Sequence, residues 1–280
     1  MNGLTAVARR LKIAEKAAAV YIENPHVAAV LVAGSVARGL ADDHSDIELD
    51  VYWAQPPEED ERVAAVEGAG WERVYAVVDE NEWADGYLID GVKIDTSGFL
   101  TSTIDNYLDA ALHRGDVDPE NQVRITALLD GRALHGVPII DAWRARCFDY
   151  PERLARAMVE SGLDLRPRER LEMLAARDDV LVLHRDIVDN VQGILDALFG
   201  LNGVYTPHPF HKWLNWEGTL LAVVPTDLVR RVRRLLVAPP HVAVEELCAL
   251  TDETFDLAQR LLPGPTVTRA RASFETRRIS

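Results

Sequence analysis

The hydrophobic pattern of the chain changes near residue 145, and this change limits the folds that the sequence can adopt. Before it, helix-like segments alternate with short strand-like segments; after it, helical periodicity recurs almost throughout. The first pattern is typical of an α/β domain and the second of an all-α domain. We therefore expect a mixed-sheet α/β domain at residues 1–145, a helical domain at 146–263, and a mobile tail at 264–280.

Gly, Pro and Asn residues mark the expected ends of the individual elements. In the first half, helices are expected at 4–22 and 101–113, with a short one after Pro57. Strands are expected at 27–33, 47–53, 72–78, 86–97 (turning at Asp90-Gly91) and 123–129. In the second half, helices are expected near 152–161, 168–199, 209–222, 226–236 and 243–262.

Composition argues against several classes of protein. No apolar run approaches the roughly 20 residues that cross a bilayer, and no signal peptide is evident, so a cytoplasmic protein without a membrane partner is expected. Cys147 and Cys248 match no metal-ligand spacing and are expected to serve packing. The net charge of -15 disfavours, without excluding, a nucleic-acid partner, although an acidic balance also serves solubility. The sequence leaves the oligomeric state open.

A Gly-Ser turn and a pair of acids follow each other along the chain. Gly34 and Ser35 come directly after the expected strand 27–33, where Gly permits close backbone approach and Ser, with the start of a short helix, can donate to phosphates. Asp46 and Glu48 open the next strand, two residues apart, so both carboxylates point to one side. Carboxylate oxygens so placed can hold a hard divalent cation.

This segment resembles the active-site motif of the nucleotidyltransferase superfamily, which includes DNA polymerase beta and the aminoglycoside nucleotidyltransferases. The shared pattern is Gly-Ser, a spacer, Asp-x-Asp/Glu and a later third acid on a strand. The run from Ser45 to Glu48, with Arg38 three residues after Ser35, looks most like the kanamycin nucleotidyltransferase branch. The resemblance covers the first half of the chain, and the second only in outline. It implies a Mg²⁺ cofactor and a nucleotide bound near Gly34, Ser35, Arg38 and Ser45.

Asp95 is the best match for the third acid, because apolar residues flank it in strand fashion. In the family, the third acid either joins the metal site or takes a proton from the acceptor hydroxyl, and the sequence leaves both roles open. Asp50 shares the expected face of Asp46 and Glu48, but the family spacing favours those two, so Asp50 is expected beside the site or at the surface.

Several other polar residues have two interpretations. Lys212, in the aromatic segment 205–213, is similar to a lysine that related enzymes extend toward the triphosphate, but a solvated lysine fits equally well. Arg185, Asp186 and Asp189 could line a pocket between domains or form a buried salt bridge. His208 and His211 are expected at the surface or in packing. The aromatic residues Tyr75, Trp83 and Tyr87 could form a stacking wall or fill the core.

Together, these features predict an enzyme that moves a nucleoside monophosphate, AMP from ATP, to a hydroxyl of a small acceptor with release of pyrophosphate. The resemblance and the acidic chain favour a cationic, aminoglycoside-like acceptor and hence a role in antibiotic resistance. One alternative is a nucleotidyltransferase that modifies a protein or RNA, as in toxin–antitoxin systems. Another is a nucleotide-binding module without catalysis.

Overall fold

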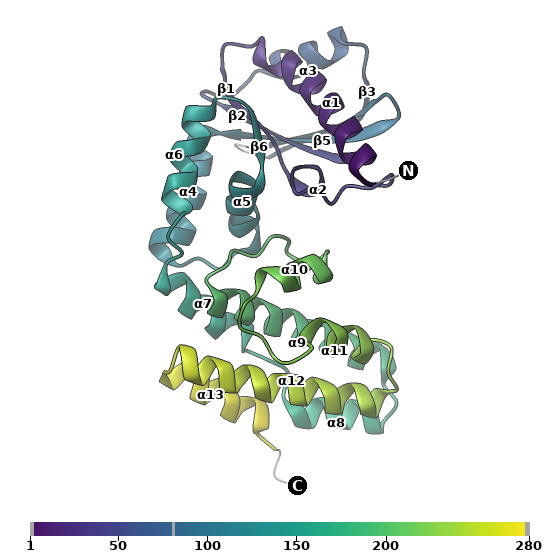
Figure 1. Cartoon of the computed structure of the whole chain (residues 1–280), viewed down its shortest axis with the longest axis vertical. Helices are drawn as coiled ribbons and strands as arrows, with labels where there is room; N and C mark the ends of the chain where they lie inside the picture. Colours follow the sequence, from purple (N-terminus) through teal and green to yellow (C-terminus); the bar gives the residue numbers. More distant parts are fainter. Residues whose placement is uncertain (1–2, 80–81, 278–280) are drawn as a thin grey trace. The chain divides into compact units, whose positions relative to one another are not determined.

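The computed structural model describes residues 3–79 and 82–277, which form a six-stranded sheet and a series of helices (Figure 1). The strand order is β3-β4-β5-β2-β1-β6. Strands β2 and β5 run parallel and every other neighbouring pair runs antiparallel, so the sheet is mixed, as the sequence predicts. The strands are β1 (Val27–Val32), β2 (Ile47–Trp53), β3 (Glu72–Asp79), β4 (Glu82–Ile89), β5 (Val92–Leu100) and β6 (Arg132–His135).

Two compact units make up the chain. The first runs to Asp109 and includes Arg124–Asp149, whereas the second comprises Ala110–Val123 and the chain from Tyr150 onward. Residues 110–123 therefore precede residue 145 in the sequence but belong to the second unit, so a single boundary near residue 145 does not describe the division. Helices before Tyr150 are α1 (Gly3–Ile22), α2 (Gly34–Ala37), α3 (Glu59–Gly68), α4 (Thr101–Asp109), the π-helix η1 (Ala110–Arg114), α5 (Pro119–Asp130) and α6 (Val137–Cys147).

Strand β2 has an apolar face and a polar face. Its residues Ile47, Leu49 and Val51 pack in one core with α1, and Ile94 of β5, the register partner of Ile47, joins them. Because side chains alternate along a strand, the even-numbered residues of β2 lie on the opposite face of the sheet. The acids at positions 48 and 50 are among them, so the fold places them on the side away from α1.

The second unit is helical and its core forms around α9. The buried residues Leu183, Ile187, Ile194 and Leu198 recur along one stripe of this helix. Helices α7 and α9 cross closely, since a Cβ at Gly162 would lie 2.5 Å from the carbonyl oxygen of Gly193. The helices are α7 (Glu152–Gly162), α8 (Arg168–Ala176), α9 (Val180–Asn202), α10 (Leu214–Leu220), α11 (Leu228–Leu235), α12 (Pro240–Leu261) and α13 (Pro265–Glu275).

Three secondary-structure expectations are wrong. The segment 123–129 is helical, within α5, because its buried residues follow a helical stripe that includes Ile125 and Leu128, and the strand follows at Arg132. The expected tail contains helix α13, which starts with Pro265 and buries Val267 and Phe274. The predicted helix 168–199 is two helices, α8 and α9, separated at residues 177–179.

Other expectations about packing are confirmed. Cys147 and Cys248 are both buried and neither belongs to a disulfide, and Trp83 and Tyr87 lie in the core of the first unit. Among the described residues, the structure shows no helix that is both long enough and apolar enough to span a membrane.

Candidate functional site

A row of residues crosses the polar face of the sheet and brings the predicted acids together. Tyr75 of β3 pairs with Gly86 of β4, Gly86 pairs with Asp95 of β5, and Asp95 pairs with Glu48 of β2. Side chains that are directly opposite each other on neighbouring strands point to the same face. The sequence separates Glu48 from Asp95 by the whole of α3, β3 and β4, and the parallel pairing of β2 with β5 places them side by side.

Gly34 forms one end of this row. Its φ of +59° is in the left-handed region, and the carboxylate of Glu48 lies directly against its Cα, so that a Cβ there would be 1.8 Å from Glu48 Oε2. The backbone N–H of Ala33 donates to the carbonyl oxygen of Glu48 over 3.0 Å, which anchors the turn to β2. A glycine is therefore needed at position 34 for two reasons: its backbone is in the left-handed region, and a side chain would occupy the space of the Glu48 carboxylate.

We expect Gly34→Ala to reduce the nucleotidyl transfer that the sequence predicts by about a hundredfold, because the new methyl group would displace Glu48, and misplacement by about 1 Å can have that effect. Gly39→Ala is the matched control: its φ is +74°, but a Cβ there meets nothing within 4 Å. Both variants bear the left-handed backbone penalty of about 1–2 kcal/mol, measurable by urea unfolding. Equal transfer rates in the two variants would contradict the proposed position of Glu48.

Asp95 is held by two neighbouring side chains. Its Oδ1 accepts a 2.7 Å hydrogen bond from the Tyr75 hydroxyl, and Lys93 Nζ lies 2.8 Å from Oδ1 and 2.9 Å from Oδ2. The Tyr75 ring lies over Gly86, where a Cβ would be only 2.2 Å from the ring. Burial, the hydrogen bond to Asp95 and the charges of Asp95, Asp85 and Asp46 raise the pKa of Tyr75, so this hydroxyl stays protonated at neutral pH and remains a donor.

Asp46 immediately precedes β2 and is half-buried. Because it lies two residues before Glu48, alternation along the strand corresponds to the same face of the sheet as Glu48 and Asp95. Asp50, two residues beyond Glu48, is instead buried and accepts a 3.2 Å hydrogen bond from the Tyr52 hydroxyl. Burial raises the pKa of Asp50, while the charge of Arg124 opposes that effect. Asp50 therefore lies beside the row and not at the surface.

The other residues predicted to bind nucleotide have partners within the first unit. Arg38 forms an ion pair with Asp130, with Nε 2.9 Å from Oδ2, and its side chain is almost fully buried. The Ser45 hydroxyl lies 3.0 Å from the Asp42 backbone nitrogen and 3.1 Å from its carboxylate, so it closes the loop before β2. Ser35 is buried in α2. Their contact with a nucleotide stays a prediction.

Lys212 belongs to the second unit. Its side chain is exposed and its Nζ lies 5.0 Å from the centre of the Trp213 ring, a cation–π contact. Its predicted contact with the triphosphate also stays a prediction.

His211, the residue before Lys212, forms a buried ionic cluster with Asp196 and Glu217 that the sequence pattern does not predict. Its Nδ1 lies 2.8 Å from Glu217 Oε2, its Nε2 lies 3.3 Å from Asp196 Oδ1, and its ring stacks on Phe199. Burial alone would lower the pKa of His211, but its two carboxylate partners outweigh this and raise the pKa to about 9. The imidazole is therefore a cation at neutral pH, which ties the loop before α10 to α9.

Asp186 forms a buried salt bridge, which is one of the two arrangements that the sequence allows for this segment. Its carboxylate is completely buried, and Arg170 Nε lies 2.6 Å from Oδ2, while Arg166 and Arg185 approach within 4.0 Å and 3.8 Å. Asp189 pairs with Arg166 at 3.9 Å. These contacts connect α8 to α9 and give the cluster a structural role in the helical unit.

A preformed cage for a metal ion is absent from the part of the chain that the structure describes. Across residues 3–79 and 82–277, no group of three or more His, Cys, Asp or Glu side chains is arranged to hold a metal ion. Mg²⁺, however, is usually held by one or two carboxylates together with waters and substrate phosphates. The donor set of Asp46 and Glu48 fits that mode of binding.

Comparisons with known proteins give matches to a family model and to several solved structures. Residues 120–214 match a family model described as a domain of unknown function (DUF4037), a segment that includes Lys212 but none of the row around Glu48. A solved structure of a nucleotidyltransferase-like protein from Exiguobacterium sibiricum is 13% identical, covering 89% of this chain and 78% of that one, with a TM-score of 0.46. No curated protein sequence matches the chain.

Proposed function

We propose that the chain is a magnesium-dependent nucleotidyltransferase that moves AMP from ATP to a hydroxyl group and releases pyrophosphate. The observation that carries the proposal is the juxtaposition of Glu48 and Asp95 at one register of two parallel strands, with Gly34 against the Glu48 carboxylate. Asp46 adds a second carboxylate next to Glu48. Acids gathered on one face of the sheet suit a reaction in which a divalent cation neutralises the charge of a triphosphate.

In this proposal Asp46 and Glu48 hold the cation. When bound, Mg²⁺ supplies positive charge that neutralises the charge developing on the phosphates during displacement. The acceptor oxygen forms a bond to the α-phosphorus of ATP, and the bond from that phosphorus to the bridging oxygen breaks, so that pyrophosphate leaves. The chain orients the reactants: Asp46 and Glu48 would hold the cation beside the triphosphate, and the turn at Gly34 accommodates the Glu48 carboxylate directly against its Cα.

The proton of the acceptor hydroxyl passes to Asp95 in the role that we favour. Asp95 lies beside Glu48 but on the neighbouring strand β5, so in this proposal the acceptor binds on the Asp95 side of Glu48. The Tyr75 hydroxyl and the Lys93 ammonium group hold its carboxylate in place. As a metal ligand, Asp95 would contribute to nucleotide binding as well as to the chemical step.

We expect Asp95→Asn to slow transfer by about a hundredfold or more while leaving ATP affinity unchanged, because a general base contributes that much to proton removal. Isothermal titration with a non-hydrolysable ATP analogue and Mg²⁺ measures affinity, and turnover measures chemistry. Loss of both would assign Asp95 to the metal site instead. Normal binding with normal turnover would remove Asp95 from either role. Lys93→Gln, which removes the partner but keeps the carboxylate, is the matched control and should retain more activity than Asp95→Asn.

The acceptor that we propose is a small cationic, aminoglycoside-like molecule, supported by the motif around Glu48 and by the net charge of -15. Lys212 is proposed to contact the triphosphate, and the cytoplasm is the proposed location. Incubation with each nucleoside triphosphate, labelled at the α-phosphorus, and with panels of aminoglycosides, RNA and proteins tests this choice. Label on an aminoglycoside supports it, and label on RNA or protein alone replaces the acceptor but keeps the reaction. Nucleotide binding without transfer to any panel would favour a non-catalytic module.

A further inference from the structure

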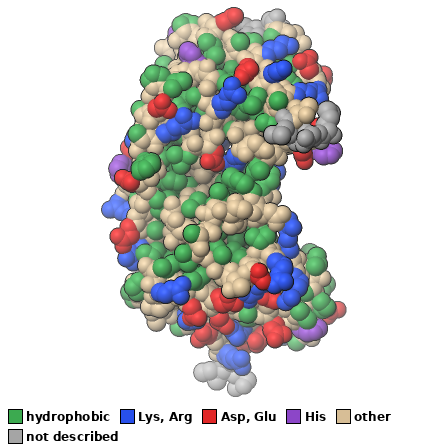
Figure 2. Space-filling view, viewed as in Figure 1, with side chains coloured by type: hydrophobic (Ala, Val, Ile, Leu, Met, Phe, Trp, Pro, Cys, Tyr) green, Lys and Arg blue, Asp and Glu red, His purple; other side chains and the backbone are tan. Residues whose placement is uncertain are grey.

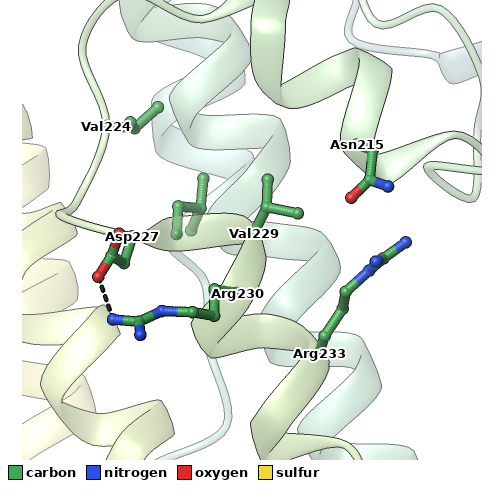
Figure 3. A pocket seen from close by; sticks show the side chains of 7 residues that line it. Asn215, Val224, Asp227, Val229, Arg230 and Arg233 are labelled. Carbon is green, nitrogen blue, oxygen red and sulfur yellow. Dashed lines mark hydrogen bonds and ion pairs between the residues drawn. The ribbon is translucent and has the colours of Figure 1, made fainter.

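A hollow of about 500 Å³ lies between α10 and α11 in the helical unit (Figure 3). The two helices meet closely, since a Cβ at Gly218 would lie 2.5 Å from Val229 Cγ2. Asn215 lies about one turn before this contact on α10, and Arg233 one turn after it on α11. Their side chains extend toward each other across the hollow, with Val229 between their helices.

The arginines of α11 differ in their partners. Arg231 and Arg234 both pair with Glu246 of α12, and Arg230 pairs with Asp227. The side chain of Arg233, in contrast, forms no hydrogen bond or ion pair with any residue that the structure describes, and the same holds for the side chain of Asn215. Lys and Arg side chains gather over α11 in the space-filling view, although the chain as a whole is strongly acidic (Figure 2).

The lining of the hollow specifies a ligand chemistry. The guanidinium groups of Arg230 and Arg233 and the carboxylate of Asp227 give the lining a net charge of +1. This charge matches a ligand with one negative charge better than a ligand with two. The planar guanidinium fork suits a carboxylate, and the Asn215 amide can donate a further hydrogen bond. Val224, Leu228 and Val229 provide an apolar surface beside these polar groups.

We propose that this hollow is a binding site for a small organic acid, whose carboxylate is held by Arg233 and Asn215 and whose apolar body lies on Val224 and Val229. All the residues that line the hollow belong to the helical unit, and none of them is part of the row around Glu48. It therefore does not depend on the proposed nucleotidyl transfer.

Benzoate is a suitable probe, because it combines one carboxylate with an apolar ring. An NMR titration of the full chain should show saturable shifts confined to α10, α11 and the loop that joins them, with a millimolar Kd as expected for a fragment. Benzamide, which has the same shape without the charge, and acetate, which lacks the ring, should each bind at least about tenfold more weakly.

Arg233→Gln should weaken benzoate binding about tenfold or more, the range for a lost charge-assisted hydrogen bond, and Asn215→Ala should weaken it less. Arg260→Gln, which removes an exposed charge on α12, is the matched control and should have no effect. Equal binding to Arg233→Gln and the intact chain would overturn the proposal, as would equal binding of benzamide or shifts spread over other helices. Tighter binding of phenyl phosphate than of benzoate would overturn the assignment to a carboxylate.

Discussion

Asp46→Asn and Glu48→Gln are each expected to lower the rate of nucleotidyl transfer about a thousandfold. Each change removes one cation-holding charge and nearly preserves the shape of the side chain, and the charge stabilisation that the cation supplies is worth several kcal/mol, or about tenfold in rate per 1.4 kcal/mol. The folded state should persist, because both residues are only half-buried and neither contributes to the apolar core around Ile47 and Leu49. Turnover with labelled ATP, together with urea unfolding, separates the two effects.

Two exposed acids on α3 supply matched controls for these variants. Asp60→Asn and Glu59→Gln remove the same charges from the same unit but away from the row that crosses the sheet. They should retain full activity, so that a loss specific to Asp46 and Glu48 reflects the site and not the net charge. Full activity of either site variant would contradict the assignment of that carboxylate to the cation.

His211→Phe is expected to destabilise the protein by about 3–5 kcal/mol, the usual effect of removing one partner from a buried ion pair. The replacement keeps a ring against Phe199 but leaves the fully buried Glu217 carboxylate without its cation. Urea unfolding of the intact chain measures the change. In the double variant His211→Phe/Glu217→Gln the buried charge is also removed, so most of the lost stability should return. Equal destabilisation of the single and double variants would contradict an ionic role for His211.

The same residue predicts a dependence of stability on pH. Because the folded-state pKa of His211 is raised to about 9 from an ordinary value of 6.5, the folded state binds this proton more tightly than the unfolded state. The contribution of His211 is therefore complete below about pH 6.5 and is lost as the pH rises toward 9. In His211→Phe this alkaline decline should disappear. An unchanged decline would assign it to other groups.

The core of the candidate site follows from local sequence patterns. Alternation along residues 47–53 places Glu48 and Asp50 on one face, and the apolar flanks of Asp95 indicate a strand, so both acids could be assigned to a sheet. The register between β2 and β5 could not be predicted from the sequence. The pairing of Glu48 with Asp95 depends on β5 lying parallel to β2 after two intervening strands. Lys93 shares the face of Asp95 two residues away, and that spacing is a signal that could have identified its partner.

The errors have identifiable physical causes. Val123, Ile125 and Thr126 are β-branched and favour a strand locally, but tertiary packing of Ile125 and Leu128 on one stripe produces α5. Likewise, the polar stretch after Pro263 hides two apolar residues, Val267 and Phe274, at a spacing that buries both in α13. The ionic cluster at His211 joins residues from α9, a loop and α10, and no periodicity in the sequence links them.

The central claim is that the chain transfers a nucleotidyl group, and the fate of two labels on ATP tests it most directly. With Mg²⁺ and an acceptor, label at the α-phosphorus should appear on the acceptor, and label at the γ-phosphorus should appear only in pyrophosphate, with Asp46→Asn producing neither. Transfer of the γ-label to the acceptor would show a phosphotransferase and contradict the proposed chemistry. Release of the γ-label as inorganic phosphate, with no label on any acceptor, would contradict it as well.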